Sequence, residues 1–466
     1  MVMFMSYKNY NELRSQYPVF RYKSYSLTSD EDSIYISYDF ETEGLTSFRP
    51  EIRIDKRDLP VINDFDSPIG RKIIFSLGMV EAVSYLKATC SPVMRVECGY
   101  LDEDSRNWWK KLYFGGLGEF FFRNGIDASF DDFLTIECSG ENIATANETA
   151  RFSSYSVVPV GGGKDSAVTA ELVKKEHPEI LFFTVNSQKA RTDTVLSAGY
   201  NEKDIIKTYR KISPELLELN KQGFLNGHTP FSAIVAFLSL YCAYLTGSRN
   251  IILSNEASAN ESNIAGSNIN HQYSKSYEFE KDFTEYAAKN IFAGIRYFSI
   301  LRPFNELQIA AEFCRHESYL YNFRSCNAGS KTNVWCCKCP KCLFVYGILS
   351  AFLSQEKLTD VFGENMLDKP EMEADFDGLV GLSPVKPFEC VGTVSEIKYA
   401  LAMCARRLIK EGKELPLLVK KFTEEFDIDK ILEEPIMTEF NEINNIPQEF
   451  ASAVKEMYSH VSAKFD

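Results

Sequence analysis

Residues 156–175 read SVVPVGGGKDSAVTAELVKK: a short apolar run, then three glycines, then a helical pattern. Apolar runs of this length are typical of buried strands, and glycines let the backbone of a turn come close to a ligand. The first N–H groups of a helix lie at the positive end of its dipole and bind phosphate readily. The stretch therefore predicts a strand, a phosphate-binding loop and a helix. It is not a Walker A loop, because Asp165 stands where Ser or Thr should follow the lysine.

Three further apolar runs follow the first, with helical patterns between them. The four expected strands cover residues 156–160, 180–185, 251–254 and 297–301. The main helical patterns cover residues 166–176, 213–219 and 231–245. This alternation predicts an α/β fold with a doubly wound parallel sheet that is buried on both faces. Ligands of such sheets bind at the carboxyl ends of the strands, so we expect the site in the loops after these runs.

The regions on either side of this core have a different texture. Residues 33–38 (SIYISY) and 51–54 (EIRI) alternate in polarity, which predicts antiparallel strands. Helical patterns with few other signals dominate the last hundred residues. We predict an N-terminal α+β domain on the substrate side (1–150), a nucleotide-binding domain (151–355) and a mainly helical C-terminal region (356–466).

Five of the 12 cysteines form a cluster between residues 326 and 342. Cys326 precedes a C-x-x-C-x-x-C run formed by Cys336, Cys339 and Cys342, and four thiolates suit a structural Zn²⁺ site. Cys337 interrupts the run and is an alternative ligand to Cys336. An iron–sulfur cluster and a metal-free group of reduced thiols are the alternatives to zinc.

Composition and charge exclude several classes of protein. The 466 residues are 45% hydrophobic and 25% charged, as in ordinary globular proteins. The net charge of −14 argues against a nucleic-acid partner, because binding phosphate backbones needs an excess of Lys and Arg. The longest apolar run, 231–245, is too short to cross a bilayer and predicts a buried core helix. We expect a cytoplasmic protein with no membrane partner.

The glycine-rich loop resembles the SGGxDS signature of the ATP pyrophosphatases, or PP-loop family. That resemblance implies that ATP and Mg²⁺ are bound by Gly162, Gly163, Lys164, Asp165 and Ser166. It also implies that the end of the second strand, at Asn186, contacts adenosine. Gly161 departs from the family, which usually has Ser there. The cysteine cluster resembles the zinc site of the 7-cyano-7-deazaguanine synthases, which are PP-loop enzymes too.

A more specific resemblance covers residues 75–410. It rests on five segments: 226–230 (NGHTP), 270–276 (NHQYSKS), 301–303 (LRP) with Glu306, 325–327 (SCN) and 386–393 (KPFECVGT). Together they resemble the UDP-N-acetylmuramoyl-L-alanyl-L-glutamate epimerases, the MurL family. The resemblance implies ATP-dependent inversion of the terminal L-glutamate of that peptidoglycan precursor, a UDP-linked muramoyl dipeptide, with release of AMP and pyrophosphate.

Epimerisation needs two acid/base groups on opposite faces of the reacting carbon. The candidates are polar residues in loops of the resembling segments: Cys390, His228, His271, Lys386 and Glu389. Arg302 and Lys275 are candidates for binding the anionic groups of the substrate. Glu256 or Glu261 could hold Mg²⁺ together with Asp165.

Three other functions compete with the epimerase. The first is a PP-loop ligase or amide-forming synthase, which would adenylate a small carboxylate and let ammonia attack it. The second, a tRNA-modifying PP-loop enzyme, is disfavoured by the acidic charge. The third, a non-catalytic nucleotide-binding module, does not explain why Lys164, Asp165 and Ser166 occur together.

Overall fold

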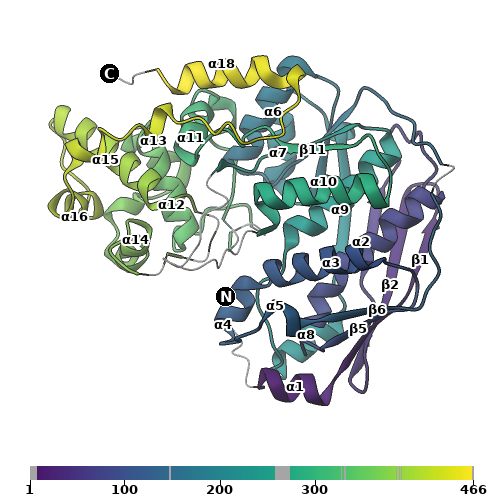
Figure 1. Cartoon of the computed structure of the whole chain (residues 1–466). Coiled ribbons are helices and arrows are strands. Elements are labelled where there is room, and N and C mark those ends of the chain that lie inside the picture. The colour runs from purple at the N-terminus through teal and green to yellow at the C-terminus, as the bar shows by residue number, and fades with distance from the viewer. Residues whose placement is uncertain are drawn as a thin grey trace.

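The computed structural model describes residues 8–145, 148–257, 273–326, 328–329, 332–384, 386–387, 389 and 391–463. One mixed sheet of eleven strands runs through it, and a group of helices lies beside the sheet (Figure 1). Six of the ten strand pairings are parallel and four are antiparallel. The predicted α/β class with a helical C-terminal region is confirmed, whereas membership of the PP-loop superfamily stays a prediction.

Five parallel strands form one half of the sheet, in the order β11-β10-β7-β8-β9. They are β7 (Ser156–Pro159), β8 (Ile180–Val185), β9 (Ile205–Lys211), β10 (Asn250–Leu253) and β11 (Arg296–Ser299). All four predicted strands are present, and β9 is an addition. The chain lays β8 and β9 on one side of β7, then β10 and β11 on the other. The glycine-rich loop after β7 therefore lies at the topological switch point, where such sheets bind ligands.

The N-terminal region supplies the other half of the sheet. Its strands are β1 (Val19–Ser29), β2 (Ser33–Thr42), β3 (Thr46–Phe48), β4 (Glu51–Asp55), β5 (Val93–Val96) and β6 (Thr135–Cys138). Strand β2 pairs antiparallel with β4, as predicted, and β4 pairs antiparallel with β9. Because the sheet continues across residue 150, backbone hydrogen bonds join the two regions. The three-part division of the chain stays a prediction.

The sheet separates two hydrophobic cores. Val157 and Leu181 point into one core, and their neighbours Val158 and Phe182 point into the other. The first core contains α2 (Pro68–Leu86), α3 (Glu103–Gly116), α9 (Phe231–Thr246) and α10 (Tyr277–Asn290). The second contains α6 (Lys164–Glu176), α7 (Lys189–Ser197), α11 (Glu306–Cys314), α12 (Pro340–Leu349), α15 (Val394–Lys410) and α18 (Ala451–Val461). Helix α9 is buried on nearly all sides, which confirms the predicted core helix.

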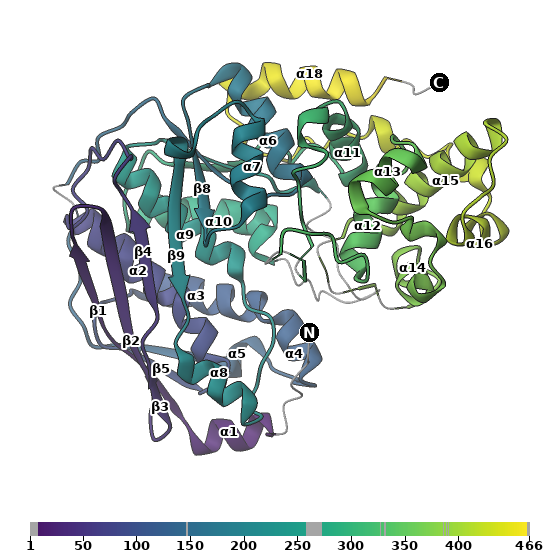
Figure 2. The ribbon, with the colours of Figure 1, turned by 180° about the vertical axis from the view of Figure 1, so that it is seen from behind.

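The remaining elements complete the two ends of the molecule. In Figure 2 strands β1 and β2 face the viewer without a helix over them, consistent with their alternating burial. Helix α18 returns from the C-terminal helices and packs against α6 (Figure 1). No helix in the described part of the chain is long and apolar enough to cross a membrane. The other helices are α1 (Tyr10–Gln16), α4 (Gly118–Arg123), α5 (Phe130–Phe133), α8 (Pro214–Lys221), α13 (Gln355–Phe362), α14 (Glu373–Leu379), α16 (Leu417–Glu425) and α17 (Ile428–Ile431).

Candidate active site

The glycine-rich loop joins β7 to α6 in a conformation that needs glycine. Gly162 has a φ of +87°, and a Cβ there would lie 3.1 Å from the carbonyl carbon of Ala190 at the start of α7. Gly163 is the N-cap of α6 and has no side chain to cap the first N–H groups of the helix. Ser166 Oγ accepts a hydrogen bond of 3.0 Å from the Gly161 N–H and closes the loop. The result is the kind of helix N-terminus that binds phosphate.

Lys164, the first residue of α6, is buried beside two carboxylates. Its ammonium forms ion pairs with Asp165 and with Glu306, the first residue of α11. Burial disfavours the charged lysine, but the two carboxylates outweigh it and raise the pKa of Lys164. Burial also works to raise the pKa of Asp165; Lys164 and, more weakly, Lys341 and Lys275 hold it below its usual value. The loop thus carries a buried cation whose charge is already balanced.

A third buried carboxylate connects this pair to α15. Glu396 Oε1 accepts a hydrogen bond of 2.8 Å from the Glu306 N–H, and its other oxygen accepts one from the Thr393 N–H. Burial, together with the nearby Glu306, raises the pKa of Glu396 to about 7. A Cβ at Gly392 would lie 2.5 Å from Glu396 Oε2 and 2.9 Å from Glu306 Cγ. The segment before α15 therefore packs directly on the carboxylates beside Lys164.

The four cysteines of the predicted metal site lie together. The Sγ atoms of Cys326, Cys336, Cys339 and Cys342 are all within 4.8 Å of one another. Three of the Sγ–Sγ distances are 4.0, 3.7 and 3.5 Å, and a tetrahedral Zn²⁺ with Zn–S bonds of about 2.3 Å would give about 3.8 Å. Cys337 lies outside the group, with its Sγ 3.4 Å from the Phe362 carbonyl oxygen. The donor set thus fits a structural Zn²⁺ bound through Cys336 rather than Cys337.

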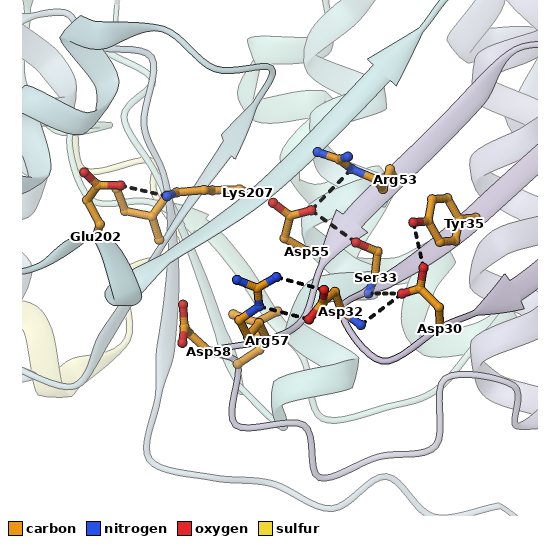
Figure 3. A pocket seen from close by; sticks show the side chains of 12 residues that line it. Asp30, Asp32, Ser33, Tyr35, Arg53, Asp55, Arg57, Asp58, Glu202 and Lys207 are labelled. Carbon is orange, nitrogen blue, oxygen red and sulfur yellow. Dashed lines mark hydrogen bonds and ion pairs between the residues drawn. The ribbon is translucent and has the colours of Figure 1, made fainter.

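The pocket in Figure 3 lies on the side of the sheet where the parallel strands begin, at the start of β9 and the end of β4. It has a volume of about 370 Å³ and a lining rich in charged side chains. These pair with one another: Arg57 with Asp32 at 2.8 Å, Lys207 with Glu202 at 2.8 Å and Arg53 with Asp55 at 3.3 Å. Acidic side chains outnumber basic ones in this lining by five to three, and ligands of parallel sheets bind at the carboxyl ends of the strands, so we do not assign the nucleotide site here.

Comparison with known proteins places the chain in a family. Residues 11–300 match the model of the MurL N-terminal domain, and residues 322–431 match that of the MurL C-terminal domain. The chain belongs to the MurL family.

Three relatives have the name UDP-N-acetyl-alpha-D-muramoyl-L-alanyl-L-glutamate epimerase. The relative from Xanthomonas oryzae pv. oryzae is 32% identical over 370 residues, covering 78% of this chain and 81% of that protein. The relative from Salinispora tropica is 31% identical over 402 residues (84% and 86%), and that from Micromonospora sp. is 30% identical over 404 residues (85% and 89%). No solved structure shows a significant match to the chain.

The structure describes three of the other candidate residues of this MurL chain: His228, Lys386 and Glu389. His271 and Cys390 lie outside the described residues. His228 precedes α9, with Nδ1 3.6 Å from Glu119 Oε2 on α4. Lys386 donates a hydrogen bond of 2.8 Å to the Gly392 carbonyl, and Glu389 lies in the turn that follows.

The residues predicted to bind adenosine and the substrate hold backbone segments in this structure. Asn186 has a φ of +61°, and its side-chain oxygen accepts a hydrogen bond of 2.9 Å from the Arg210 N–H. Arg302 is fully buried and donates to the carbonyl oxygens of Glu256 and Lys275 and to the Glu280 carboxylate. Arg302 therefore brings Lys275 toward the loop, while direct binding of the substrate by Arg302 or Lys275 stays a prediction.

Two residues of the site were missed as candidates, although each stands in a readable motif. Glu396 closes the capping box T-x-x-E with Thr393 at the start of α15. Lys341, whose charge helps Lys164 to hold the pKa of Asp165 below its usual value, lies inside the cysteine run between Cys339 and Cys342. A capping box predicts a helix start, and a lysine between metal ligands is ordinarily a solvated charge. Neither motif reveals a contact with the phosphate loop.

Proposed function

We propose that the chain uses ATP to invert the terminal L-glutamate of UDP-N-acetylmuramoyl-L-alanyl-L-glutamate to D-glutamate. The names of its relatives support the substrate and the epimerisation. The loop at residues 161–166 supports the use of ATP, because it combines a glycine-built turn, a helix N-terminus and a buried lysine at the switch point of the sheet.

Activation of the carboxylate explains why ATP is needed. The α-proton beside a free carboxylate is hard to remove, because the enolate would carry a second negative charge. In the proposed reaction a carboxylate oxygen attacks the α-phosphate of ATP, pyrophosphate leaves, and an acyl-adenylate forms. A base then removes the α-proton from one face, an acid returns a proton to the other, and water releases AMP and the D-glutamyl product.

Residues of the loop have distinct roles in this scheme. The N–H groups at the start of α6 bind the departing pyrophosphate, and Lys164 turns from Glu306 toward phosphate oxygens. Asp165 is a ligand for the Mg²⁺ that accompanies ATP. The four cysteines bind a structural Zn²⁺, which orders the loop that carries them and takes no part in the reaction.

The observation that carries the proposal is the contact of Gly392 with the carboxylates beside this loop. Gly392 contacts Glu396 and Glu306, and Glu306 pairs with Lys164. A reactive group in the 386–393 segment would work next to the activated carboxyl. Cys390, Lys386 and Glu389 are its acid/base candidates, and His228 and His271 are the candidates from other loops.

Incubation in D₂O with ATP, Mg²⁺ and the muramoyl dipeptide tests the proposal. The expected products are AMP, pyrophosphate and the muramoyl dipeptide with a terminal D-glutamyl residue that carries one deuterium on Cα, detected as D-glutamate after acid hydrolysis. AMP without deuterium or inversion would exclude the epimerase and favour the ligase, which ammonium or amine acceptors would then reveal. Absence of both AMP and inversion, in protein shown to be folded, would contradict the proposal.

A pair of cysteine variants tests the proposed acid/base role. Cys390→Ser should still form AMP but incorporate much less deuterium. Cys138→Ser is the matched control, because Cys138 is a half-buried free thiol on the edge strand β6. Equal deuterium incorporation by both variants would remove Cys390 from the candidates.

A further inference from the structure

The segment that leads into the cysteine cluster touches the phosphate loop. The backbone N–H of Arg324 donates a hydrogen bond of 2.7 Å to the carbonyl oxygen of Gly162. A Cβ at Gly163 would lie 3.4 Å from the Cβ of Ser325. The next residue, Cys326, belongs to the metal-binding group. The metal ligand Cys326 thus directly follows the two residues, Arg324 and Ser325, that contact the turn of the loop.

The bond to Gly162 determines where the loop directs its next N–H group. The described peptide bonds of the chain are trans, so the carbonyl of Gly162 and the N–H of Gly163 point in opposite directions. Because Arg324 holds the carbonyl on the side of the cysteine cluster, the Gly163 N–H points away from that side. Loss of the bond would let this peptide rotate and would disorder the phosphate-binding turn.

The side chain of Arg324 joins the two limbs of the cysteine loop, which are residues 321–326 with Cys326 and residues 333–342 with the other three cysteines. Its Nη1 donates to the carbonyl oxygens of Tyr321 (3.0 Å) and Phe323 (2.6 Å), and its Nε donates to that of Asn333 (3.2 Å). Its guanidinium also lies over the ring of Trp335, 5.8 Å from the centroid. Fixing one limb in place therefore also restricts the other limb, and with it the Arg324 N–H that binds Gly162.

We propose that a metal in the Cys₄ group and a nucleotide at the phosphate loop stabilise each other, with Arg324 as the positioning residue that couples them. The inference rests on the proposed function in one respect, that the loop binds ATP. Without a metal, four thiols supply only weak hydrogen bonds to hold the cysteine loop together. A bound metal fixes Cys326, and with it the donor to Gly162. By linkage, a nucleotide must then tighten metal binding at equilibrium by the factor by which the metal tightens nucleotide binding.

Metal release from the intact protein tests the coupling without measuring activity. Protein loaded with Zn²⁺ is mixed with a zinc-selective chromogenic chelator, with and without a saturating non-hydrolysable ATP analogue and Mg²⁺. At equilibrium the analogue should lower the dissociation constant of zinc at least about fivefold, the lower end of ordinary coupling between two sites, so that less zinc passes to the chelator. The dissociation constant of the analogue should rise by a similar factor when zinc is removed.

Two arginine variants separate the coupling from the metal site itself. Arg324→Ala keeps the four cysteines and the backbone N–H but releases the two limbs, so it should bind zinc while the effect of the analogue falls to about twofold or less. Arg406→Ala, which changes an exposed arginine on α15, is the matched control and should keep the full effect.

The outcomes distinguish the coupling from the proposed function. Equal zinc release with and without a bound analogue would overturn the coupling and leave ATP binding intact. Failure of the zinc-loaded protein to bind the analogue at all would overturn both. The wild-type comparison decides the question even if Arg324→Ala does not fold.

Discussion

Replacement of Lys164 by methionine tests the charge balance on which the phosphate loop depends. The side chains of Lys164 and Glu306 are 5% and 4% exposed, so their ion pair is shielded from water. Removal of one partner from such a pair costs about 3–5 kcal/mol, because the remaining charge is buried and uncompensated. In Lys164→Met this charge is the carboxylate of Glu306, and Glu396 lies close to it with a second carboxyl.

The loss should show in the unfolding temperature. The entropy of unfolding is about 2.1 cal/mol/K per residue, which gives about 1 kcal/mol per degree if all 466 residues unfold together. Lys164→Met should therefore lower Tm by about 3–5 °C at pH 8. The loss should be smaller at pH 5, because the folded-state pKa of Glu306 rises further in the variant and protonation then removes the uncompensated charge.

A double mutant and a control make the prediction specific. Lys164→Met/Glu306→Gln also removes the buried Glu306 charge, leaves only the partly exposed Asp165 without its lysine, and should recover about 1–3 kcal/mol relative to Lys164→Met. Lys175→Met, on the same helix, removes a partly exposed pair with Glu456 and should change stability by at most about 0.5 kcal/mol. Unfolding measured by calorimetry at both pH values is the assay. Equal stability of Lys164→Met and Lys175→Met, or strict additivity in the double mutant, would refute the reasoning.

Three further variants test other parts of the structure. Gly162→Ala should weaken ATP binding about tenfold, because alanine is strained at positive φ. Gly161→Ala, where a Cβ has room, should bind ATP nearly as well as wild type. Titration with ATP compares the two variants. Burial raises the pKa of Glu396 in the folded protein from 4.5 to about 7. The folded state therefore favours the protonated carboxyl, and the stability gained is complete below about pH 4.5 and is lost as the pH rises through 7. Glu396→Gln should therefore remove roughly 2 kcal/mol of the fall in unfolding free energy between pH 5 and 8, measured in urea, and an unchanged slope would contradict the burial of a titrating carboxyl. Arg302→Met should cost about 3 kcal/mol of stability, and Arg302→Met/Glu280→Gln should recover part of this loss. A higher KM at unchanged Tm would instead indicate that Arg302 contacts the substrate.

Elements with a strong local signal were predictable from the sequence. The strand–loop–helix at residues 156–176 needed only its apolar run, its glycines and the helical pattern after them, while phosphate binding by the loop stays a prediction. The core helix α9 needed only a long apolar run, which ends at Gly247 in the left-handed conformation typical of a helix end. The cysteine group was predictable because three of its members lie at a spacing of three residues.

Elements that depend on a distant partner were harder to predict. Strand β9 (IIKTYRK) has few apolar residues and therefore gives a weak strand signal. Its pairing with β4 joins residues far apart in the chain. Cys336 and Cys337 are adjacent and chemically identical. The choice between them came from the positive φ of Cys337, which turns its thiol toward Phe362.

The sequence by itself determined the parallel core, the phosphate loop, the cysteine group and the resemblance to the family, because each follows from residues close together in the chain. Only the tertiary structure decided that Glu306 and Glu396 share their surroundings with Lys164, and that Arg324 holds Gly162. These contacts join residues that are distant in sequence, and burial gives them their energy by removing water from around the charges and hydrogen bonds. A charged or polar residue has the same letter whether it is solvated or buried, so its partner becomes known only when the chain is folded.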